Sequence, residues 1–299
     1  MESLNFYDRP KFDKAGHLRT DNAWLERQIA SDSSQIVPIW RSRNFVADIE
    51  NPRLTTMPMN ESILNDSPVI VFLGLFNGTA HFAVDLSHYE KPPFCDAGRF
   101  ADLRVIGTLL PRDESSLMAF ARAHMTWHKR HRFCGCCGAA TKSKNGGHVR
   151  VCTNKNCKTS CFPRIDPAVI MLIHDGSDRI ILGRKKTMLP GQHSILAGFV
   201  EPGESLENAV AREVFEEVGI EITDVQYHSS QPWPFPANIM LGFTARATTF
   251  ELNVDYNELE GGARWFSKEY LRNSPENDTF RLPRKDSISR RLMTEWIES

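Results

Sequence analysis

Residues 198–220 read GFVEPGESLENAVAREVFEEVGI, and this stretch decides how the carboxy-terminal half of the chain folds. It begins as a glycine-containing loop and continues as a helix, for which Ser205 is the expected amino-terminal cap and Gly219 the expected stop. One side of the helix is apolar, formed by Leu206, Ala209, Val210, Val214 and Val218. We therefore expect a loop and helix that cover one face of a sheet.

The same helix carries a cluster of carboxylates. Glu213, Glu216 and Glu217 stand at positions i, i+3 and i+4, so a helix presents them on one face. Like charges so placed repel one another unless a cation lies among them. Hard oxygen ligands suit Mg²⁺ or Mn²⁺, ions that bridge protein carboxylates to substrate phosphates. The alternative interpretation is a solvated acidic helix face.

The stretch resembles the Nudix box, G-x5-E-x7-R-E-U-x-E-E-x-G-U, in which U is a bulky apolar residue. The chain fills every fixed position, with Gly198, Glu204, Arg212, Glu213, Val214, Glu216, Glu217, Gly219 and Ile220. The resemblance implies a Nudix hydrolase whose catalytic domain is an α/β/α sandwich. It also implies that Glu213 and Glu217 are the principal metal ligands, with Glu216 beside them. Glu204 is then expected to orient the helix or its metal shell, and Arg212 to pair with a carboxylate of the box.

Composition sets broad limits on the protein. The chain has 299 residues, of which 41% are hydrophobic and 24% charged, values typical of soluble globular proteins. The formal net charge of -1 favours neither nucleic acid nor an anionic membrane as a partner. No apolar run is long enough to span a bilayer, and the first residues lack the pattern of a secretory signal. We expect a cytoplasmic protein that does not associate with membranes.

Cysteine spacing indicates a second metal site. Six of the seven cysteines lie between residues 134 and 161. Cys134-x2-Cys137 and Cys152-x4-Cys157 are separated by fourteen residues, which is the layout of a zinc ribbon. Four thiolates fill a tetrahedral shell, so this Zn²⁺ is expected to be structural and not catalytic. The alternative is a set of reduced cysteines without metal.

The three remaining cysteines are not expected to bind zinc. Cys136 is out of register for a two-residue knuckle, and Cys161 lies where a strand is expected to begin. Each is interpreted as a small apolar filler. Cys95 is far from the cluster and is expected to be a free thiol.

These features predict three domains and an α+β fold class. Residues 1–127 form an amino-terminal α+β domain, in which Asp113 is the expected cap of a helix. Residues 128–163 form the zinc ribbon, and residues 164–299 form the Nudix domain. Hydrophobic runs before and after the box predict the strands of its sheet, and DSISRRLMTEWIE predicts a closing amphipathic helix.

The segment SQPWPFP, residues 230–236, distinguishes among possible substrates. Its alternating prolines stiffen the backbone and hold Trp233 and Phe235 in fixed directions, which suits the edge of a base-sized pocket. The alternative is an ordinary proline-rich loop with its aromatic side chains turned inward. The segment is similar to the signature of the NADH pyrophosphatase branch of the Nudix family. That resemblance extends from about Leu103 to the carboxy terminus and includes the zinc ribbon.

The resemblance assigns a set of residues to the substrate: Phe162, Ala197, Phe199, Gln231, Pro232, Trp233, Pro234, Phe235, Pro236, Glu258 and Ser289. Phe199 is expected to stack on a base. Phe162 is expected to reach the pocket of a neighbouring subunit, which implies a homodimer. Glu258 is the expected further metal ligand, with Glu260 as the alternative, because the spacing to the following Trp265 is one residue longer than is usual in the family.

The implied reaction is metal-dependent hydrolysis of the pyrophosphate of NADH or NAD⁺ to nicotinamide mononucleotide and AMP. Glu217 or Glu216 accepts the proton of the attacking water. A second hypothesis is removal of an NAD cap from RNA 5′ ends by the same chemistry. For that hypothesis the basic run at residues 128–132 binds RNA phosphates, and the alternative for the run is a solvated helix end. A third hypothesis is a non-catalytic zinc-ribbon protein that binds nucleic acid, although every glutamate of the box is present.

Overall fold

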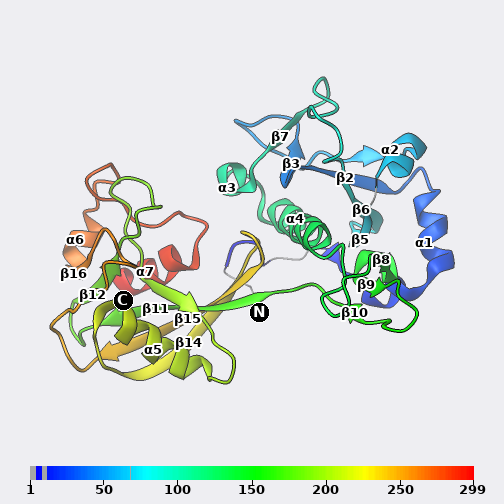
Figure 1. The fold of residues 1–299 in the computed structure, drawn as a ribbon. Coiled ribbons are helices and arrows are strands. Elements are labelled where there is room, and N and C mark those ends of the chain that lie inside the picture. The colour runs from blue at the N-terminus through cyan, green and yellow to red at the C-terminus, as the bar shows by residue number, and fades with distance from the viewer. Residues whose placement is uncertain (1–4, 9–11, 68) are drawn as a thin grey trace. The chain divides into compact units, whose positions relative to one another are not determined.

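The computed structural model describes residues 5–8, 12–67 and 69–299. The chain folds into two compact units. The amino-terminal unit holds residues 7–165 together with the short segment 234–237, and the carboxy-terminal unit holds residues 5–6, 166–233 and 238–299. Figure 1 shows the elements of both units.

A mixed sheet forms the centre of the amino-terminal unit. Its strands follow the order β1 (Phe12–Asp13), β5 (Ile70–Phe76), β6 (Thr79–Asp85), β2 (Gln35–Trp40), β3 (Arg43–Val46) and β7 (Arg99–Ala101), and β4 (Met57–Pro58) also pairs with β2. The helices of this unit are η1 (Gly16–Thr20), α1 (Asn22–Ile29), α2 (Glu61–Asp66), α3 (Leu103–Ile106) and α4 (Arg112–Arg130). The long helix α4 packs Leu117, Ala121 and Met125 against buried aliphatic side chains of β2, β5 and β6.

The expectation that Asp113 caps this long helix was wrong. The helix begins one residue earlier, at Arg112, and follows Pro111 without a side-chain cap. Pro111 is the residue before the helix, with ψ 139°, and it has no side-chain acceptor for the backbone of the first turn. Asp113 lies in the first turn, where a negative charge interacts favourably with the helix dipole.

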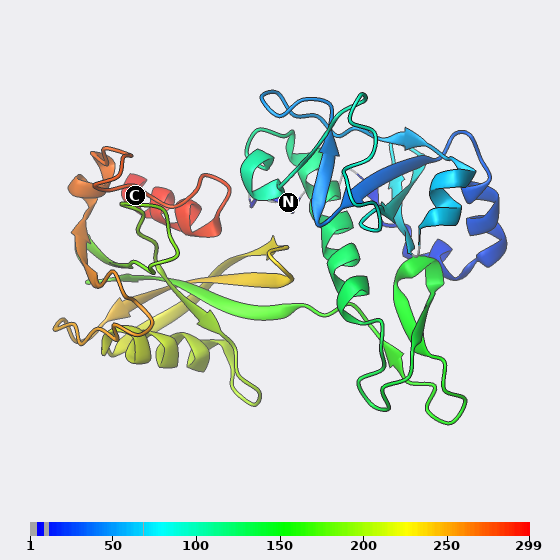
Figure 2. The same ribbon diagram turned by 45° about the horizontal axis from the view of Figure 1, so that its top comes forward.

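The zinc ribbon is a three-stranded sheet in the order β10 (Ser160–Cys161), β9 (Val149–Cys152) and β8 (Thr141–Lys144), with the short helix η2 (Asn145–Gly147) between β8 and β9 (Figure 2, green).

Buried histidines hold the ribbon against the rest of its unit. His128 of α4 bonds the carbonyl of Gly147 through Nε2 at 2.7 Å, and His148 bonds the carbonyl of Phe72 through Nε2 at 2.7 Å. Arg150 donates to Nδ1 of His128 at 2.8 Å. Because arginine only donates, His128 is neutral and carries its proton on Nε2. Burial lowers the pKa of both His128 and His148 to about 4.

The carboxy-terminal unit is a sheet between two helical layers. Its strands follow the order β14 (Ile222–Trp233), β15 (Asn238–Ala247), β11 (Asp166–His174), β12 (Arg179–Gly183) and β16 (Ala263–Ser267), and β13 (Leu196–Phe199) also pairs with β11. The pair β11 and β15 is parallel, and the other pairs are antiparallel.

The alternation of side chains along β11 explains the two layers. Val169 and Met171 lie in the core under α5 (Leu206–Val218), whereas Ile170 and Leu172 lie in the core under α6 (Lys268–Arg272) and α7 (Ile288–Glu298). The expected α/β/α sandwich is therefore confirmed. In the described residues, no helix has the length and apolar character needed to cross a membrane.

Candidate active site

The helix α5 begins and ends where the sequence predicts. The hydroxyl of Ser205 accepts a hydrogen bond from the backbone of Asn208 at 3.2 Å. At the other end Gly219 adopts φ 69°, a left-handed conformation that glycine reaches without strain. These caps fix which turns of the helix carry the glutamates.

The first residue of the loop, Gly198, makes room for the carboxylate of Glu213. Gly198 belongs to β13 and pairs with Val169 of β11. A Cβ atom at this position would lie 1.8 Å from the Cδ of Glu213, which is an impossible separation. The glycine is therefore required by the close approach of the helix side chain to the strand.

Arg212 organises the acidic groups around it. Its guanidinium donates to both oxygens of Glu204, at 2.7 and 3.1 Å, and to the carbonyl of Phe199 at 2.9 Å. The same guanidinium contacts Glu213 and Glu216, each at 2.9 Å. Hydrogen bonds from Arg212 lower the pKa of Glu204. The predicted pairing of Arg212 with carboxylates of the box is confirmed, and it leaves the guanidinium no free donor of its usual five.

Glu217 is the most buried carboxylate of the cluster, with 2% of its surface exposed. Its Oε1 lies 3.4 Å from the ammonium nitrogen of Lys185, and its Oε2 is buried without a hydrogen-bond partner among the described residues. Burial raises the pKa of Glu217 to about 7, against the opposing effect of Lys185. A buried carboxylate oxygen without a partner is energetically costly unless a cation or a donor occupies the space beside it.

Lys185, which the sequence did not single out, connects Glu217 to a third region of the chain. Its ammonium nitrogen also lies 3.4 Å from Oε2 of Glu258. Burial opposes the charge, but Glu217 and Glu258 together raise the pKa of Lys185. Glu260 is directed elsewhere, since its carboxylate accepts from the backbone of Lys186 at 2.8 Å. The geometry therefore favours Glu258 over Glu260 as a partner of Glu217.

The donor set fits a divalent cation. Glu213 and Glu217 are one helical turn apart on α5, and Glu258 approaches the same lysine as Glu217. All three offer carboxylate oxygens, the ligands that Mg²⁺ and Mn²⁺ prefer. Oε2 of Glu217, which has no hydrogen-bond partner within the described ranges, supports this fit.

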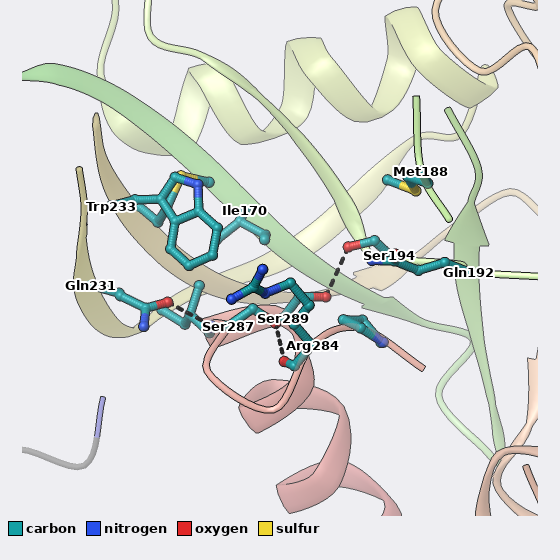
Figure 3. Close-up of a pocket in the computed structure, with 12 residues that line it drawn as sticks. Ile170, Met188, Gln192, Ser194, Gln231, Trp233, Arg284, Ser287 and Ser289 are labelled. Atoms are coloured by element: carbon teal, nitrogen blue, oxygen red, sulfur yellow. Dashed lines mark hydrogen bonds between the residues drawn. The ribbon is translucent and has the colours of Figure 1, made fainter. Parts of the chain in front are cut away.

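A pocket of about 190 Å³ lies in the same unit, on the face of the sheet that carries α7 (Figure 3). It is lined by Ile170, Met188, Gln192, Ser194, Gln231, Trp233, Met240, Pro283, Arg284, Ser287, Ile288 and Ser289. The hydroxyls of Ser194 and Ser289 hydrogen-bond each other at 2.9 Å in its wall. Three of the expected substrate residues, Gln231, Trp233 and Ser289, are therefore brought together in one cavity.

Gln231 stabilises the start of α7 in the wall of this pocket. Its Oε1 accepts from the backbone of Ile288 at 2.6 Å, and its Nε2 donates to the carbonyl of Asp286 at 2.7 Å. With 1% of its surface exposed, the side chain fixes the first turn of α7. The side chain of Trp233, by contrast, borders the cavity itself (Figure 3).

Other expected substrate residues lie outside this cavity. Phe235 packs edge-on against Tyr7, with ring centres 6.1 Å apart. The guanidinium groups of Arg104 and Arg122 each lie 4.8 Å from the centre of the Phe235 ring. Phe199 is 57% exposed. The remaining positions are Ala197 in β13, Pro232 in β14, Pro234 and Pro236 in the segment 234–237, and Phe162 on the surface of the amino-terminal unit.

The four expected zinc cysteines form one group. The Sγ atoms of Cys134, Cys137, Cys152 and Cys157 all lie within 4.8 Å of one another, with the pairs 134–157 and 137–152 at 3.8 and 3.5 Å. A tetrahedron with Zn–S bonds of about 2.3 Å places its sulfurs about 3.8 Å apart, so the thiols fit a structural zinc. Cys136 is exposed and outside this group.

Comparison with known families accounts for most of the sequence. Residues 33–127 match the NADH pyrophosphatase-like rudimentary NUDIX domain, residues 129–162 match the NADH pyrophosphatase zinc ribbon domain, and residues 164–288 match the NUDIX domain. These matches define a Nudix fold with an attached zinc ribbon.

Individual relatives agree with this pattern. NAD-capped RNA hydrolase NudC of Mycobacterium bovis is 35% identical over 308 residues, which cover 99% of this chain and 96% of the relative. NAD-capped RNA hydrolase NUDT12 of Macaca fascicularis is 42% identical over 198 residues, and Nudix hydrolase 19, chloroplastic, of Arabidopsis thaliana is 48% identical over 166 residues. The matched segments span only 43% and 38% of the latter two proteins. The chain belongs to the Nudix hydrolases of the NADH pyrophosphatase type.

Proposed function

We propose that this protein hydrolyses the pyrophosphate bond of NADH or NAD⁺ and releases nicotinamide mononucleotide and AMP. The observation that carries the proposal is the buried carboxylate of Glu217, beside Glu213 and Glu258. One of its oxygens has no hydrogen-bond partner in the part of the chain that the structure describes. Such a group suits a divalent cation that binds a diphosphate. The relatives named NAD-capped RNA hydrolase act on a substrate that contains the same diphosphate, which supports the choice of dinucleotide.

Glu213, Glu217 and Glu258 would hold Mg²⁺ or Mn²⁺, with Glu216 beside them. A bound ion of this kind neutralises charge on the diphosphate and lowers the pKa of a bound water. Arg212 keeps Glu213 and Glu216 in place through its hydrogen bonds, so these carboxylates need not reorganise during the reaction.

A carboxylate of the cluster must also accept the proton of the attacking water. Glu216 already accepts a hydrogen bond from Arg212, whereas Oε2 of Glu217 has no partner among the described residues. We propose that Glu217 or Glu216 accepts this proton, through an oxygen that does not hold the ion.

The cavity beside α7 is proposed to bind one nucleoside end of the substrate. Trp233 offers an aromatic surface for stacking, and the hydroxyls of Ser194 and Ser289 offer hydrogen bonds to a base or an amide. Phe199, which is exposed at the start of the loop, remains a second stacking candidate. The exposed Phe162 remains the candidate for contact with the pocket of a second copy in a homodimer.

The test is turnover by the purified protein with NADH, NAD⁺, ADP-ribose and diadenosine tetraphosphate, each with Mg²⁺ or Mn²⁺. We expect the two dinucleotides to be the best substrates, and Glu217→Gln to lower kcat by at least about a hundredfold while the protein remains folded. A clear preference for ADP-ribose would contradict the choice of substrate. Full activity of Glu217→Gln would contradict the site.

A second candidate function is removal of the NAD cap from RNA. It requires the same cleavage, and relatives that match this chain carry that name. The third hypothesis, a non-catalytic protein that binds nucleic acid, is disfavoured because the box carboxylates are intact and organised around Arg212. The expected cytoplasmic location stays a prediction.

A further inference from the structure

Positive charge is concentrated in one part of this nearly neutral chain. Residues 115–165 contain ten of the 36 Lys and Arg residues and none of the 37 Asp and Glu residues. The rest of the chain therefore carries 26 basic against 37 acidic side chains. This stretch comprises most of α4, the zinc ribbon and the residues that follow it. The formal net charge of -1 therefore results from a basic stretch and an acidic remainder that nearly cancel.

Most of these basic side chains are exposed and lie in the ribbon or next to it. Arg122 and Arg150 are buried. Seven others are exposed and have no ion-pair partner within the described part of the chain: Lys129, Arg130, Arg132, Lys142, Lys144, Lys155 and Lys158. His128, the first residue of the basic run 128–132, neither faces solvent nor is available to bind phosphate, because it is buried and hydrogen-bonded to the carbonyl of Gly147.

The pairing of β8 with β9 shows which face of the ribbon is charged. Arg150 pairs in register with Ser143, and it reaches back to the hydroxyl of Thr141 at 2.7 Å and to His128 of α4. The face of β8 that carries Thr141 and Ser143 therefore faces α4. Because side chains alternate along a strand, Lys142 and Lys144 lie on the opposite, outer face. We call this face, with Lys142 and Lys144, the outer ribbon face.

An exposed aromatic ring adjoins this sheet. Phe133 is 64% exposed and bridges to Ala140, directly before β8. The guanidinium of Arg132 lies 5.9 Å from the Phe133 ring centre. Basic side chains next to exposed aromatic rings are the combination with which proteins bind single-stranded nucleic acid, because phosphates pair with the former and bases stack on the latter.

We propose that the outer ribbon face, with Arg132 and Phe133 beside it, binds the phosphate backbone and bases of single-stranded RNA. The inference rests on the second candidate function, in which the dinucleotide is the cap of an RNA, and it assigns RNA binding to a specific surface of the amino-terminal unit. The zinc–tetrathiolate group carries roughly two negative charges, which the ten basic residues exceed by a wide margin. A polyanion with regularly spaced phosphates complements this extended positive charge better than a single acidic ligand does.

The experiment is fluorescence anisotropy of a labelled, uncapped single-stranded RNA with the full chain in its zinc-bound form, measured between 50 and about 200 mM salt. Lys142→Glu/Lys144→Glu is compared with Arg27→Glu/Lys91→Glu. The second pair changes the net charge equally at exposed positions outside the ribbon. We expect the ribbon variant to bind RNA at least about tenfold more weakly. Its plot of log binding constant against log salt concentration should be less steep by about 1.4, because two phosphate contacts are lost. The control should bind like the unmodified protein.

Phe133→Ala separates stacking from charge. We expect it to weaken binding by about fivefold or more without changing the salt slope. Equal loss in the ribbon variant and the control would overturn the proposal, since it would show that only net charge matters. Binding of anionic phospholipid vesicles in preference to RNA would also overturn it.

Turnover of free NADH is measured in parallel on every variant. An unchanged rate together with weakened RNA binding supports the assignment of the surface. Normal NADH turnover by a protein that binds no RNA would overturn this inference and leave the proposed diphosphatase intact. Absent NADH turnover with retained, ribbon-dependent RNA binding would overturn the proposed reaction and leave the RNA surface standing.

Discussion

The ammonium nitrogen of Lys185 lies 3.4 Å from Oε1 of Glu217, so a residue just after β12 meets the most buried carboxylate of α5. Lys185 also lies 3.4 Å from Glu258. The chain therefore supplies one positive charge of its own between two of the proposed metal ligands. This contact stabilises carboxylates that would otherwise repel each other.

Lys185→Met is expected to destabilise the metal-free protein. Removing one partner of a largely buried ion pair leaves Glu217 without its cation, at a cost of about 1–3 kcal/mol. Since Lys185 is about one-third exposed, the lower end of that range is expected, which corresponds to a melting temperature about 2–4 °C lower in a chelating buffer at pH 8. Mg²⁺ should reduce the difference. Lys186→Met, at an exposed neighbouring position, is the control, and an equal loss there would contradict the role of Lys185.

Gly198→Ala is expected to displace Glu213. The added Cβ would lie 1.8 Å from the Cδ of this glutamate, so the carboxylate must leave its position. We expect kcat for NADH to fall by about a hundredfold or more, because a misplacement of about 1 Å in a catalytic constellation has that effect. Circular dichroism and the melting temperature establish whether the fold is retained. Normal kcat in a folded variant would show that Glu213 is dispensable.

Cys134→Ser is expected to release zinc and destabilise the amino-terminal unit. Metal analysis should find one Zn²⁺ per chain in the unmodified protein and much less in the variant, because three thiolates with a hydroxyl bind zinc poorly. Metal binding in small zinc domains contributes several kcal/mol to folding, so the melting temperature should fall clearly. Cys95→Ser, at an exposed thiol outside the group of four, should retain both zinc and stability.

Acid is expected to weaken the attachment of the ribbon through His128. Its pKa is lowered from 6.5 to about 4 by burial, so the unfolded chain binds a proton in this range of pH that the folded chain rejects. The stability is fully present above about pH 6.5 and is lost as the pH falls toward 4, by at most about 3 kcal/mol. Protonation would also turn Nδ1 into a donor that faces the donor of Arg150.

His128→Gln tests this pH dependence, because its amide can replace both hydrogen bonds without titrating. Unfolding by urea at pH 7 and pH 5, with zinc content measured at each pH, should show a smaller pH-dependent loss for the variant. The same loss in both proteins would assign the acid sensitivity to other groups.

Much of the carboxy-terminal unit is predictable from the sequence because its signals are local. Ser205 and Gly219 determine the ends of α5 through their own side-chain and backbone properties, and the spacing of Glu213 and Glu217 places both on one face whatever surrounds the helix. The spacing of four cysteines similarly predicts their meeting around one metal ion.

Tertiary structure alone decided the features that depend on residues distant in sequence. The contacts of Lys185 with Glu217 and Glu258 join segments that no periodicity or motif relates. The same holds for the packing of Phe235 against Tyr7. The sequence determined which chemical groups this protein carries and on which local elements, because caps, turns and side-chain periods act over a few residues. Only the folded chain determined which of those groups meet, because burial and pairing depend on how the strands between them are ordered in the sheet.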